Sequence, residues 1–387
     1  MHTMDFRETD EQHALRDAVR KLGGAYGHEY FVEMAKSGGK CTELWKQAGD
    51  YGFLGVNLAE EYGGGAAGVY ELQIVAEEFA AAGCPLLMLV VSPAICGSLI
   101  QAFGTDEQRL RWLPPIISGE SIMSFAITEP DAGSNSHNIA TVARRDGGDY
   151  VLNGTKYYIS GVDEADTVLV VTRTGSDENG RGRLSLVVVP TDAPGLTKTL
   201  IPVEMTAPEK QFTLFFDDVR VPAENLVGTE GDGLRQVFHG LNPERIMGAA
   251  VANGITRYAL EKASEYARTR QVWGVPIGSH QGVAHPLAAA RINADLARLM
   301  TQRAAWLHDQ GDRLAAEAAN MAKFAAAEAG LAALDQAIQT HGGNGLSTEY
   351  GLATLWGPMR LMRTAPISRE MILNYVARHS LGLPSSY

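Results

Sequence analysis

Two oppositely charged residues stand side by side in the stretch VFHGLNPERIMGAAVANG, where Glu244 is the only acid and Arg245 the only strong base. A carboxylate in apolar surroundings can act as a general base, because burial raises its pKa toward neutrality. The same stretch also suits the start of a helix, with Asn242 as N-cap, Pro243 at the first helical position and an acid favoured by the helix dipole. On these residues alone, a helix start is the favoured interpretation and catalysis the competing one.

Two further stretches could hold a ligand. The first, FAITEPDAGSN (125–135), runs from the end of an expected strand into a Gly/Ser loop. The second, NGTKYYISG (153–161), places Tyr157, Tyr158 and Ser160 on an expected strand. Hydroxyls and backbone amides in such loops can bind a polar ligand. Taken alone, each pattern is explained more simply by a polar turn beside a half-buried aromatic strand.

The elements that must position these residues fall into three regions. Apolar residues recur at helical spacing in residues 1–120, β-rich runs fill residues 121–228, and long alanine-rich helices follow in residues 229–387. We therefore predict an α+β chain with an N-terminal α-helical domain, a small middle domain built as a β-sheet or β-barrel, and a C-terminal helical bundle. Within the β region, Asn153-Gly154 predicts a tight hairpin between two short strands.

Composition narrows the class of protein. Acids outnumber Lys plus Arg by 45 to 33, and the resulting net charge of −12 argues against a nucleic-acid partner. Cys41, Cys84 and Cys96 lie far apart, which predicts no disulfide framework and no metal site. The uncharged run FAAAGCPLLMLVVSPAICGSLIQAF predicts two buried helices broken at Pro85 and Pro93 rather than a membrane span. The charged N-terminus lacks the apolar core of a secretion signal, so a cytoplasmic location is expected.

Several common catalytic motifs are absent from the sequence. No G-x-G-x-x-G follows an expected strand, and no G-x-x-x-x-G-K-[ST], G-x-S-x-G or H-E-x-x-H occurs. Rossmann oxidoreductases, nucleoside triphosphatases, serine hydrolases and zinc peptidases of these types are therefore disfavoured.

Five stretches together resemble the acyl-CoA dehydrogenase family of flavoproteins: EYGGGAAG, ITEPDAGSN, NGTKYYISG, YARTRQVWGVPIGSHQ and QTHGGNGLSTEY. They follow the family's order over essentially the whole chain. The resemblance implies a four-helix bundle at the C-terminus and an FAD between that bundle and the β domain. It also implies dehydrogenation of an acyl-CoA thioester to the trans-2-enoyl product. In that reaction a carboxylate takes the α-proton while the β-hydrogen leaves as hydride to flavin N5.

The resemblance assigns cofactor contacts residue by residue. Thr128 would hydrogen-bond the flavin pyrimidine edge, Tyr158 stands where many members have Trp, and Ser160 stands where they have Thr beside N5. Arg270 matches a phosphate-binding position of a neighbouring subunit, although it also suits a helix C-terminus. The full set implied for FAD is Phe125, Ile127, Thr128, Gly133, Ser134, Tyr158, Ile159, Ser160, Arg270, Trp273, Gln281, Gln339, Gly342, Gly343, Ser368 and Glu370. The set implied for the substrate is Ser134, Asn242 and Arg245.

Many family members carry the base in a Y-E-G-T motif, but this chain reads RTAPISREM at the matching place. Pro366 falls at the glutamate position and cannot take a proton, and Glu370 lies about one helical turn too far along. A minority branch, which includes isovaleryl-CoA dehydrogenase, places the base directly before the arginine of the helix that follows the β domain. That position is Glu244 here, so the resemblance favours Glu244 as the catalytic base.

The resemblance also implies partners. Some cofactor residues match positions that a neighbouring subunit contributes, which implies a homodimer or homotetramer. The family reaction implies an electron-transferring flavoprotein as the electron acceptor and a role in fatty acid metabolism. Three alternatives stay open: a dehydrogenase of acyl-carrier-protein thioesters, an enoyl thioester reductase on the same fold, and a flavin-less scaffold subunit. The sequence does not specify the length or branching of the acyl chain.

Overall fold

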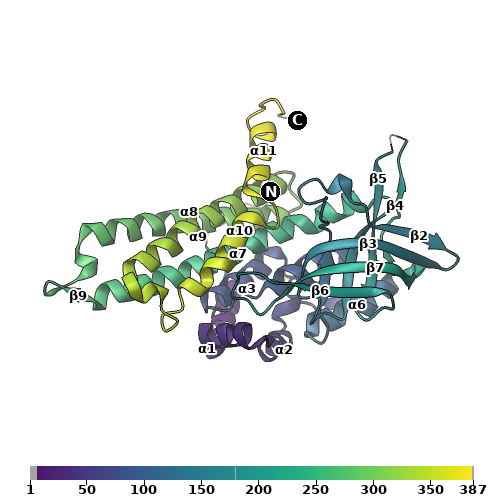
Figure 1. Cartoon of the computed structure of the whole chain (residues 1–387). Helices are drawn as coiled ribbons and strands as arrows, with labels where there is room; N and C mark the ends of the chain where they lie inside the picture. The colour runs from purple at the N-terminus through teal and green to yellow at the C-terminus, as the bar shows by residue number, and fades with distance from the viewer. Residues whose placement is uncertain (1–6, 179, 386–387) are drawn as a thin grey trace.

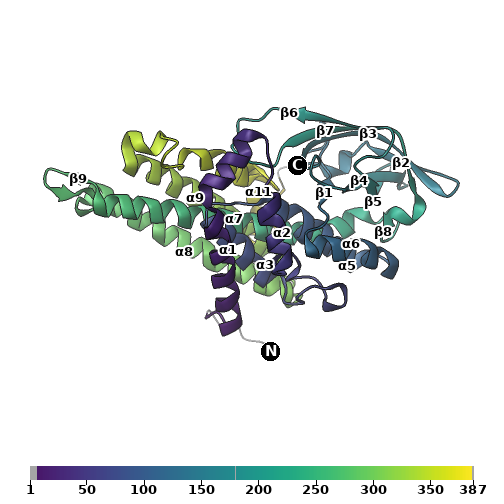
Figure 2. The ribbon, with the colours of Figure 1, turned by 90° about the horizontal axis from the view of Figure 1, so that it is seen from below.

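The computed structural model describes residues 7–178 and 180–385. An N-terminal group of helices lies beneath two larger parts, a β-sheet at one end and a bundle of long helices at the other (Figure 1). Viewed from below, α1 crosses under the bundle (Figure 2). The N-terminal helices are α1 (Asp10–Ser37), α2 (Thr42–Asp50), α3 (Val69–Ala81), α4 (Leu87–Leu89), α5 (Ser98–Phe103) and α6 (Asp106–Ser118).

The long uncharged run of the N-terminal region forms buried helices, as predicted, but only one of its two expected breaks exists. Helix α3 ends at Ala81 and the chain resumes as helix at Leu87, after Pro85. Pro93, in contrast, lies inside the π-helical segment η3 (Val90–Gly97), which continues directly into α5. A proline lacks the N–H of a regular α-turn, and the irregular π-turn absorbs that defect without ending the helix. The predicted break at Pro93 was therefore wrong. None of the described helices is both long and apolar enough to cross a bilayer.

The middle region is a single mixed sheet with the order β6-β7-β3-β2-β4-β5-β8, and β1 pairs in parallel with β4. One face carries its own apolar core, which includes Tyr150, Val170 and Leu214. The other face joins the core of the helical parts through residues such as Phe125 and Leu169. The strands are β1 (Met123–Ala126), β2 (Val142–Asp146), β3 (Asp149–Ser160), β4 (Thr167–Ser176), β5 (Gly182–Pro190), β6 (Leu196–Ile201), β7 (Gln211–Pro222) and β8 (Leu226–Val227).

Asn153-Gly154 is not a hairpin turn, contrary to the prediction. Both residues lie within the continuous strand β3, at a register shift relative to β7. Gly154 has φ +146°, and a Cβ on it would lie 2.5 Å from Oγ1 of Thr141. The glycine therefore serves a bulge and a close backbone approach rather than a turn. The turn before β3 is made by Gly147 and Gly148 instead.

Three long helices dominate the C-terminal region, and a glycine lets the first of them approach the N-terminal helices closely. At Gly254 a Cβ would lie 2.3 Å from the carbonyl oxygen of Glu77, so α7 and α3 meet almost backbone to backbone. Two shorter helices follow, of which α10 packs on α9 and α7. The elements are α7 (Gly233–Thr269), the hairpin β9 (Gln271–Val272) and β10 (Val275–Pro276), α8 (Gln281–Asp309), α9 (Ala315–His341), α10 (Trp356–Thr364) and α11 (Arg369–His379).

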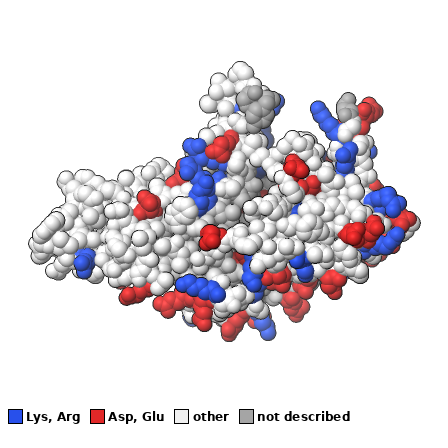
Figure 3. Space-filling model, in the orientation of Figure 1, with Lys and Arg blue, Asp and Glu red and all other residues white. Residues whose placement is uncertain are grey.

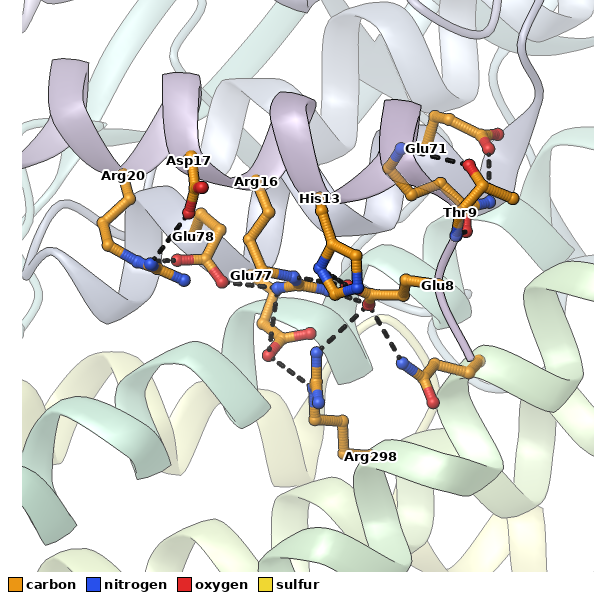
Figure 4. A network of polar contacts seen from close by, with 12 residues as sticks. Glu8, Thr9, His13, Arg16, Asp17, Arg20, Glu71, Glu77, Glu78 and Arg298 are labelled. Carbon is orange, nitrogen blue, oxygen red and sulfur yellow. Dashed lines mark hydrogen bonds and ion pairs between the residues drawn. The ribbon is translucent and has the colours of Figure 1, made fainter. Parts of the chain in front are cut away.

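A buried cluster of charges joins the N-terminal helices to the bundle (Figure 4). Arg16 of α1 is 6% exposed and pairs with Glu8 and with Glu78 of α3. Glu77, also on α3, accepts from Arg257 of α7 at 2.7 Å and Arg298 of α8 at 2.8 Å. Because each buried carboxylate is shared by several guanidinium groups, the cluster fixes α1 and α3 against the helix that carries Glu244. Its members are Glu8, Arg16, Arg20, Glu77, Glu78, Arg257 and Arg298.

Candidate active site

Glu244 lies in the interior of α7, so the helix-start interpretation of its stretch is wrong. The helix begins at Gly233 with Asp232 as its N-cap, eleven residues or about three turns before Glu244. Pro243 is buried within the helix instead of occupying its first position, and Asn242 caps nothing. The helical region predicted from residue 229 onward already included VFHGL, and the structure shows that the capping pattern at Asn242 does not start a new helix there. The position of Glu244 therefore needs another explanation than helix capping.

The carboxyl group of Glu244 is held in an environment that favours its neutral form. It is half-buried and has no hydrogen bond or ion pair with the described residues. Some of its surface remains accessible, yet the surrounding protein strips most of its hydration. Burial raises the pKa of Glu244 to about 7, and the charges of Arg245 and Lys323 only partly offset that effect. A base with a pKa near the working pH suits removal of a weakly acidic proton.

Two cations flank Glu244. Arg245 is 7% exposed, and its Nη1 donates to Oδ1 of Asn242 at 2.9 Å, which holds the guanidinium beside the carboxyl group without a direct ion pair. Lys323 of α9 is 2% exposed, and its Nζ donates to the carbonyl oxygen of Ile367. Burial lowers the pKa of Lys323 to about 8, against the opposing charge of Glu244.

Sequence reasoning did not identify Lys323. The available signal was a lone lysine on the buried face of the alanine-rich run AANMAKFAAAEAG. A charged residue at a buried helical position is rarely tolerated without a partner, so it marks a polar site in the core.

The segment that matches the family's common base position packs against α7 next to Glu244. A Cβ on Gly248, one turn after Glu244, would lie 3.6 Å from Cδ of Pro366. Ser368 caps α11 by accepting from the backbone N–H of Met371 at 3.3 Å. Glu370 is exposed and pairs with Arg369 at 3.6 Å, so it does not face this surface of α7. The structure thus brings Pro366 and Glu244 onto one surface and leaves Glu370 outside.

The stretch 125–135 and the end of β3, which carry two of the motifs, lie side by side. The N–H of Tyr157 donates to the carbonyl oxygen of Thr128 at 2.9 Å, and Oγ of Ser124 donates to the carbonyl oxygen of Ser160 at 3.0 Å. Sγ of Cys96, in η3, contacts the carbonyl oxygen of Ser124 at 3.5 Å. Complete burial, and then the nearby charge of Glu244, raise the pKa of Cys96. Cys96 therefore contacts β1 at Ser124 and lies near enough to Glu244 to be affected by its charge.

A buried ion pair holds the loop that follows β1. Nζ of Lys156, which is fully buried, donates to Oε1 of Glu129 at 2.8 Å and to the carbonyl oxygen of Ile127 at 3.0 Å. The Glu129 carboxylate also accepts from the backbone N–H groups of Ala140 and Thr141. Sequence analysis missed this pair, although a lysine inside the β-rich run NGTKYYISG was the signal. The pair closes the 127–141 loop into one shape.

The side chains expected beside a ligand at this edge differ in their orientation. Tyr158 is 52% exposed with φ +56°, and Tyr157 contacts its ring edge-on at 4.4 Å between centroids. Ile159 is 2% exposed and points into the β core, so only its backbone is available to a cofactor. The hydroxyl of Ser160 donates to Oε1 of Gln211 at 2.9 Å. Gly133 and Ser134 are exposed on the loop, whereas Ile127 and Thr128 are half-buried and Phe125 is buried.

The remaining expected cofactor residues lie at the other end of the bundle, near the β9 hairpin (Figure 1). From Glu244 to Arg270 the helix α7 runs 26 residues, or roughly 39 Å. Asn344 Nδ2 donates to the hydroxyl of Tyr266 at 3.1 Å, which places the GGNG turn beside this end of α7. This second group therefore lies far from Glu244 within one chain. The distal group is Arg270, Trp273, Gln281, Gln339, Gly342 and Gly343, all exposed.

Comparison with known families agrees with the fold. Models of the N-terminal, middle and C-terminal domains of acyl-CoA dehydrogenases match residues 9–120, 124–219 and 231–381. The chain belongs to the acyl-CoA dehydrogenase family and is an FAD-dependent oxidoreductase that acts on acyl-CoA.

Individual relatives extend this result. The chain is 58% identical to acyl-CoA dehydrogenase FadE12 of Mycobacterium tuberculosis over 100% of both chains. It is 31% identical to the mitochondrial long-chain specific acyl-CoA dehydrogenase of Sus scrofa, over 96% of this chain and 86% of that protein. Butyryl-CoA dehydrogenase from Megasphaera elsdenii superposes with a TM-score of 0.92 at 28% identity, over 98% of this chain and 100% of that structure. The glutaryl-CoA complex of a glutaryl-coenzyme A dehydrogenase gives 0.94 at 29% identity, over 99% and 98%.

The residues present fit FAD on structural grounds. Tyr158 offers an exposed aromatic ring beside Ser160, as a flavin requires for shielding. At the distal end, Trp273 is 88% exposed, and apart from the adjacent backbone no atom of the described residues lies within 4 Å of a Cβ placed on Gly342 or Gly343. Nε2 of His280 is buried there without a hydrogen-bond partner among the described residues. An open glycine backbone, an exposed indole and an orphaned imidazole nitrogen together suit a nucleotide.

Proposed function

We propose that the enzyme removes the α-proton of an acyl-CoA thioester with Glu244 and releases the trans-2-enoyl thioester. The observation that carries this proposal is the unpaired carboxyl group of Glu244, with a pKa near 7, on the surface of α7 that faces Pro366. The base would then be placed as in the isovaleryl-CoA dehydrogenase branch, because Pro366 cannot accept a proton at the more common position.

The residues around Glu244 support the proton transfer. Before the reaction the carboxylate is ionised and its charge is balanced by Arg245 and Lys323; after it, the apolar surroundings favour the neutral acid. Arg245, fixed by Asn242, would orient Glu244 or the substrate. FAD, when bound, accepts the β-hydrogen as hydride. Ser160 and Thr128 would hold its flavin, and the exposed ring of Tyr158 would cover one flavin face.

We propose that two chains complete each FAD site, because the distal group lies too far from Ser160 to serve it within one chain. Figure 3 shows few charged side chains at the end of the molecule formed by α8 and the β9 hairpin. Ile292, Leu296 and Leu299 follow one another at helical spacing on α8 and are 61%, 61% and 42% exposed. An apolar helix face of this kind suits burial against a second copy of the chain. A homodimer or homotetramer follows.

We also propose an electron acceptor and a cellular context. An electron-transferring flavoprotein would take the electrons from the reduced cofactor, and fatty acid metabolism in the cytoplasm would supply the thioester. Ser134, exposed on the loop after β1, would contact the phosphate side of the substrate.

Glu244→Gln tests the proposal directly. The variant keeps the shape of the side chain and removes the base, so it should bind FAD and stay yellow while substrate no longer bleaches the flavin. Glu370→Gln is the matched control for the role of base: this carboxylate is exposed and is not proposed to take the proton, so substrate should still bleach the flavin once the variant is loaded with FAD. Full bleaching by Glu244→Gln, or loss of bleaching in Glu370→Gln alone, would refute the assignment of the base.

A further inference from the structure

A small cavity lies among α1, α4, the loop between β6 and β7, α7 and α10. Its volume is about 20 Å³, which is enough for one water-sized group. Its walls are apolar and include Leu87, Met205, Val251 and Met362, with one exception, Glu209.

Glu209 is an unusual residue to line such an apolar cavity. Its side chain is 5% exposed, and Oε1 accepts from the backbone N–H of Leu87 at 2.9 Å. Oε2 is buried and has no hydrogen-bond partner among the described residues. Burial, and then the charge of Glu164, raise the pKa of Glu209 to about 7. A buried carboxyl oxygen without a partner is costly, so a polar group that fills the cavity would satisfy it.

The cavity lies on the same surface of α7 as Glu244. Glu244, Gly248 and Val251 are separated by four and three residues and so share one face of the helix. Pro366 and Met362 cover Gly248, where a Cβ would lie 3.6 Å from the former and 3.9 Å from the latter. Met362 and Val251 then line the cavity. Val251 is seven residues beyond Glu244, or about 10 Å along the helix axis.

We propose that this cavity receives the far end of the acyl chain and that Glu209 selects a chain that ends in a hydroxyl group. The inference rests on the proposed function, since it assumes that the α-carbon lies at Glu244. An extended chain advances about 1.2 Å per bond, by analogy with a polypeptide at roughly 3.5 Å for three bonds. About nine bonds therefore separate the α-carbon from the group beside Glu209, as in a 10-hydroxydecanoyl chain.

A hydroxyl group at the end of the acyl chain matches the site better than a carboxylate or a methyl group does. It both donates and accepts, so it satisfies Oε2 whether Glu209 is neutral or ionised. A terminal carboxylate would meet the carboxyl groups of Glu209 and Glu164, whose charge Lys40 offsets only in part, and be repelled. A plain methyl end would leave Oε2 without a partner. A site built to bond a hydroxyl should therefore discriminate against the plain chain roughly tenfold or more.

The test compares decanoyl-CoA with 10-hydroxydecanoyl-CoA on the FAD-loaded enzyme, with kcat/KM taken from flavin bleaching or turnover. The natural chain should prefer the hydroxylated thioester at least tenfold. Glu209→Leu should remove or reverse that preference, and Glu209→Gln should retain part of it because an amide still donates and accepts. Flavin absorbance of each variant confirms that it is folded and loaded.

The outcomes separate the two proposals. Equal use of both thioesters by the natural chain, with no change in Glu209→Leu, would mean that the cavity holds only a trapped water, and would overturn the selection by Glu209. In that case bleaching of the natural chain by decanoyl-CoA, together with its loss in Glu244→Gln, would still support Glu244 as the base. Absence of bleaching with every acyl-CoA would overturn both proposals.

Discussion

Replacing Arg16 by Met tests whether the buried charge cluster holds the N-terminal helices against α7. Arg16 is 6% exposed and bridges Glu8 and Glu78, so its removal leaves buried carboxylates with fewer partners. Removing one member of a buried ion pair costs about 3–5 kcal/mol. Because Arg257 and Arg298 remain to pair with these carboxylates, we expect the lower end, about 3 kcal/mol.

The loss of stability converts to a measurable shift in melting temperature. Unfolding entropy is about 2.1 cal/mol/K per residue, which for a chain of 387 residues gives about 0.8 kcal/mol/K. A loss of about 3 kcal/mol then lowers Tm by about 4 °C in calorimetry of the FAD-loaded protein. Arg20→Met is the matched control: Arg20 contacts the same Glu78 at 3.2 Å, but its side chain is 52% exposed, so a change of at most about 1 °C is expected.

The pH dependence of the same measurement adds a second check. Burial opposes ionisation of Glu78, but its hydrogen bonds and charge contacts with Arg257 and Arg16 hold its pKa below the ordinary value of 4.5. A lowered carboxylate pKa stabilises the fold above about pH 4.5, and this contribution disappears as the pH falls through the lowered value. The gap between Arg16→Met and the natural chain should therefore narrow in acid. A Tm for Arg16→Met no lower than that of Arg20→Met at neutral pH would refute the role given to the cluster.

Three further predictions concern the site itself. Because the base must be ionised and the pKa of Glu244 is raised to about 7, flavin reduction should slow about tenfold per pH unit below pH 7 in stopped-flow measurements. Lys323→Met removes a charge that lowers the pKa of Glu244, so it should move the midpoint of this pH profile to higher pH. An unchanged midpoint would contradict the coupling of Lys323 to Glu244. Gly248→Ala places a methyl group at contact distance from Met362, so kcat/KM should fall several-fold for decanoyl-CoA but little for butyryl-CoA. Equal losses for both substrates would argue against an acyl path along α7. Lys156→Met leaves the buried carboxylate of Glu129 without its cation and should weaken FAD binding by the apoprotein tenfold or more in a fluorescence titration. The same change at the exposed Lys198 should have no effect.

Local sequence patterns determined the type and order of the elements. Long alanine-rich runs predicted helices after residue 229, where α7, α8 and α9 lie, and β-rich runs predicted strands in residues 121–228, among them β4, β5 and β7. These predictions succeeded because each segment is long and its period is set by the backbone geometry itself. The choice of Glu244 over the position of Pro366 as the candidate base could also be made from the sequence alone.

Helix limits and turns depended on tertiary contacts instead. Asn242-Pro243 has the composition of a helix start, yet α7 extends ten residues further upstream because residues such as Val237 pack into the core. Asn153-Gly154 has the composition of a hairpin, yet close contact with Thr141 makes it a bulge. In both cases local preference is worth about 1 kcal/mol, and burial of apolar surface outweighs it.

The sequence by itself determined which residue types were available for chemistry, and the tertiary structure decided which of them share an environment. Glu244 became a candidate base by its place beside Arg245, but its pKa depends on burial and on Lys323, 79 positions away in the chain. Glu209 carried no local signal at all. Its significance arises only where five separate elements enclose a cavity around one unpaired oxygen, because desolvation is a property of the packed core and not of the local sequence.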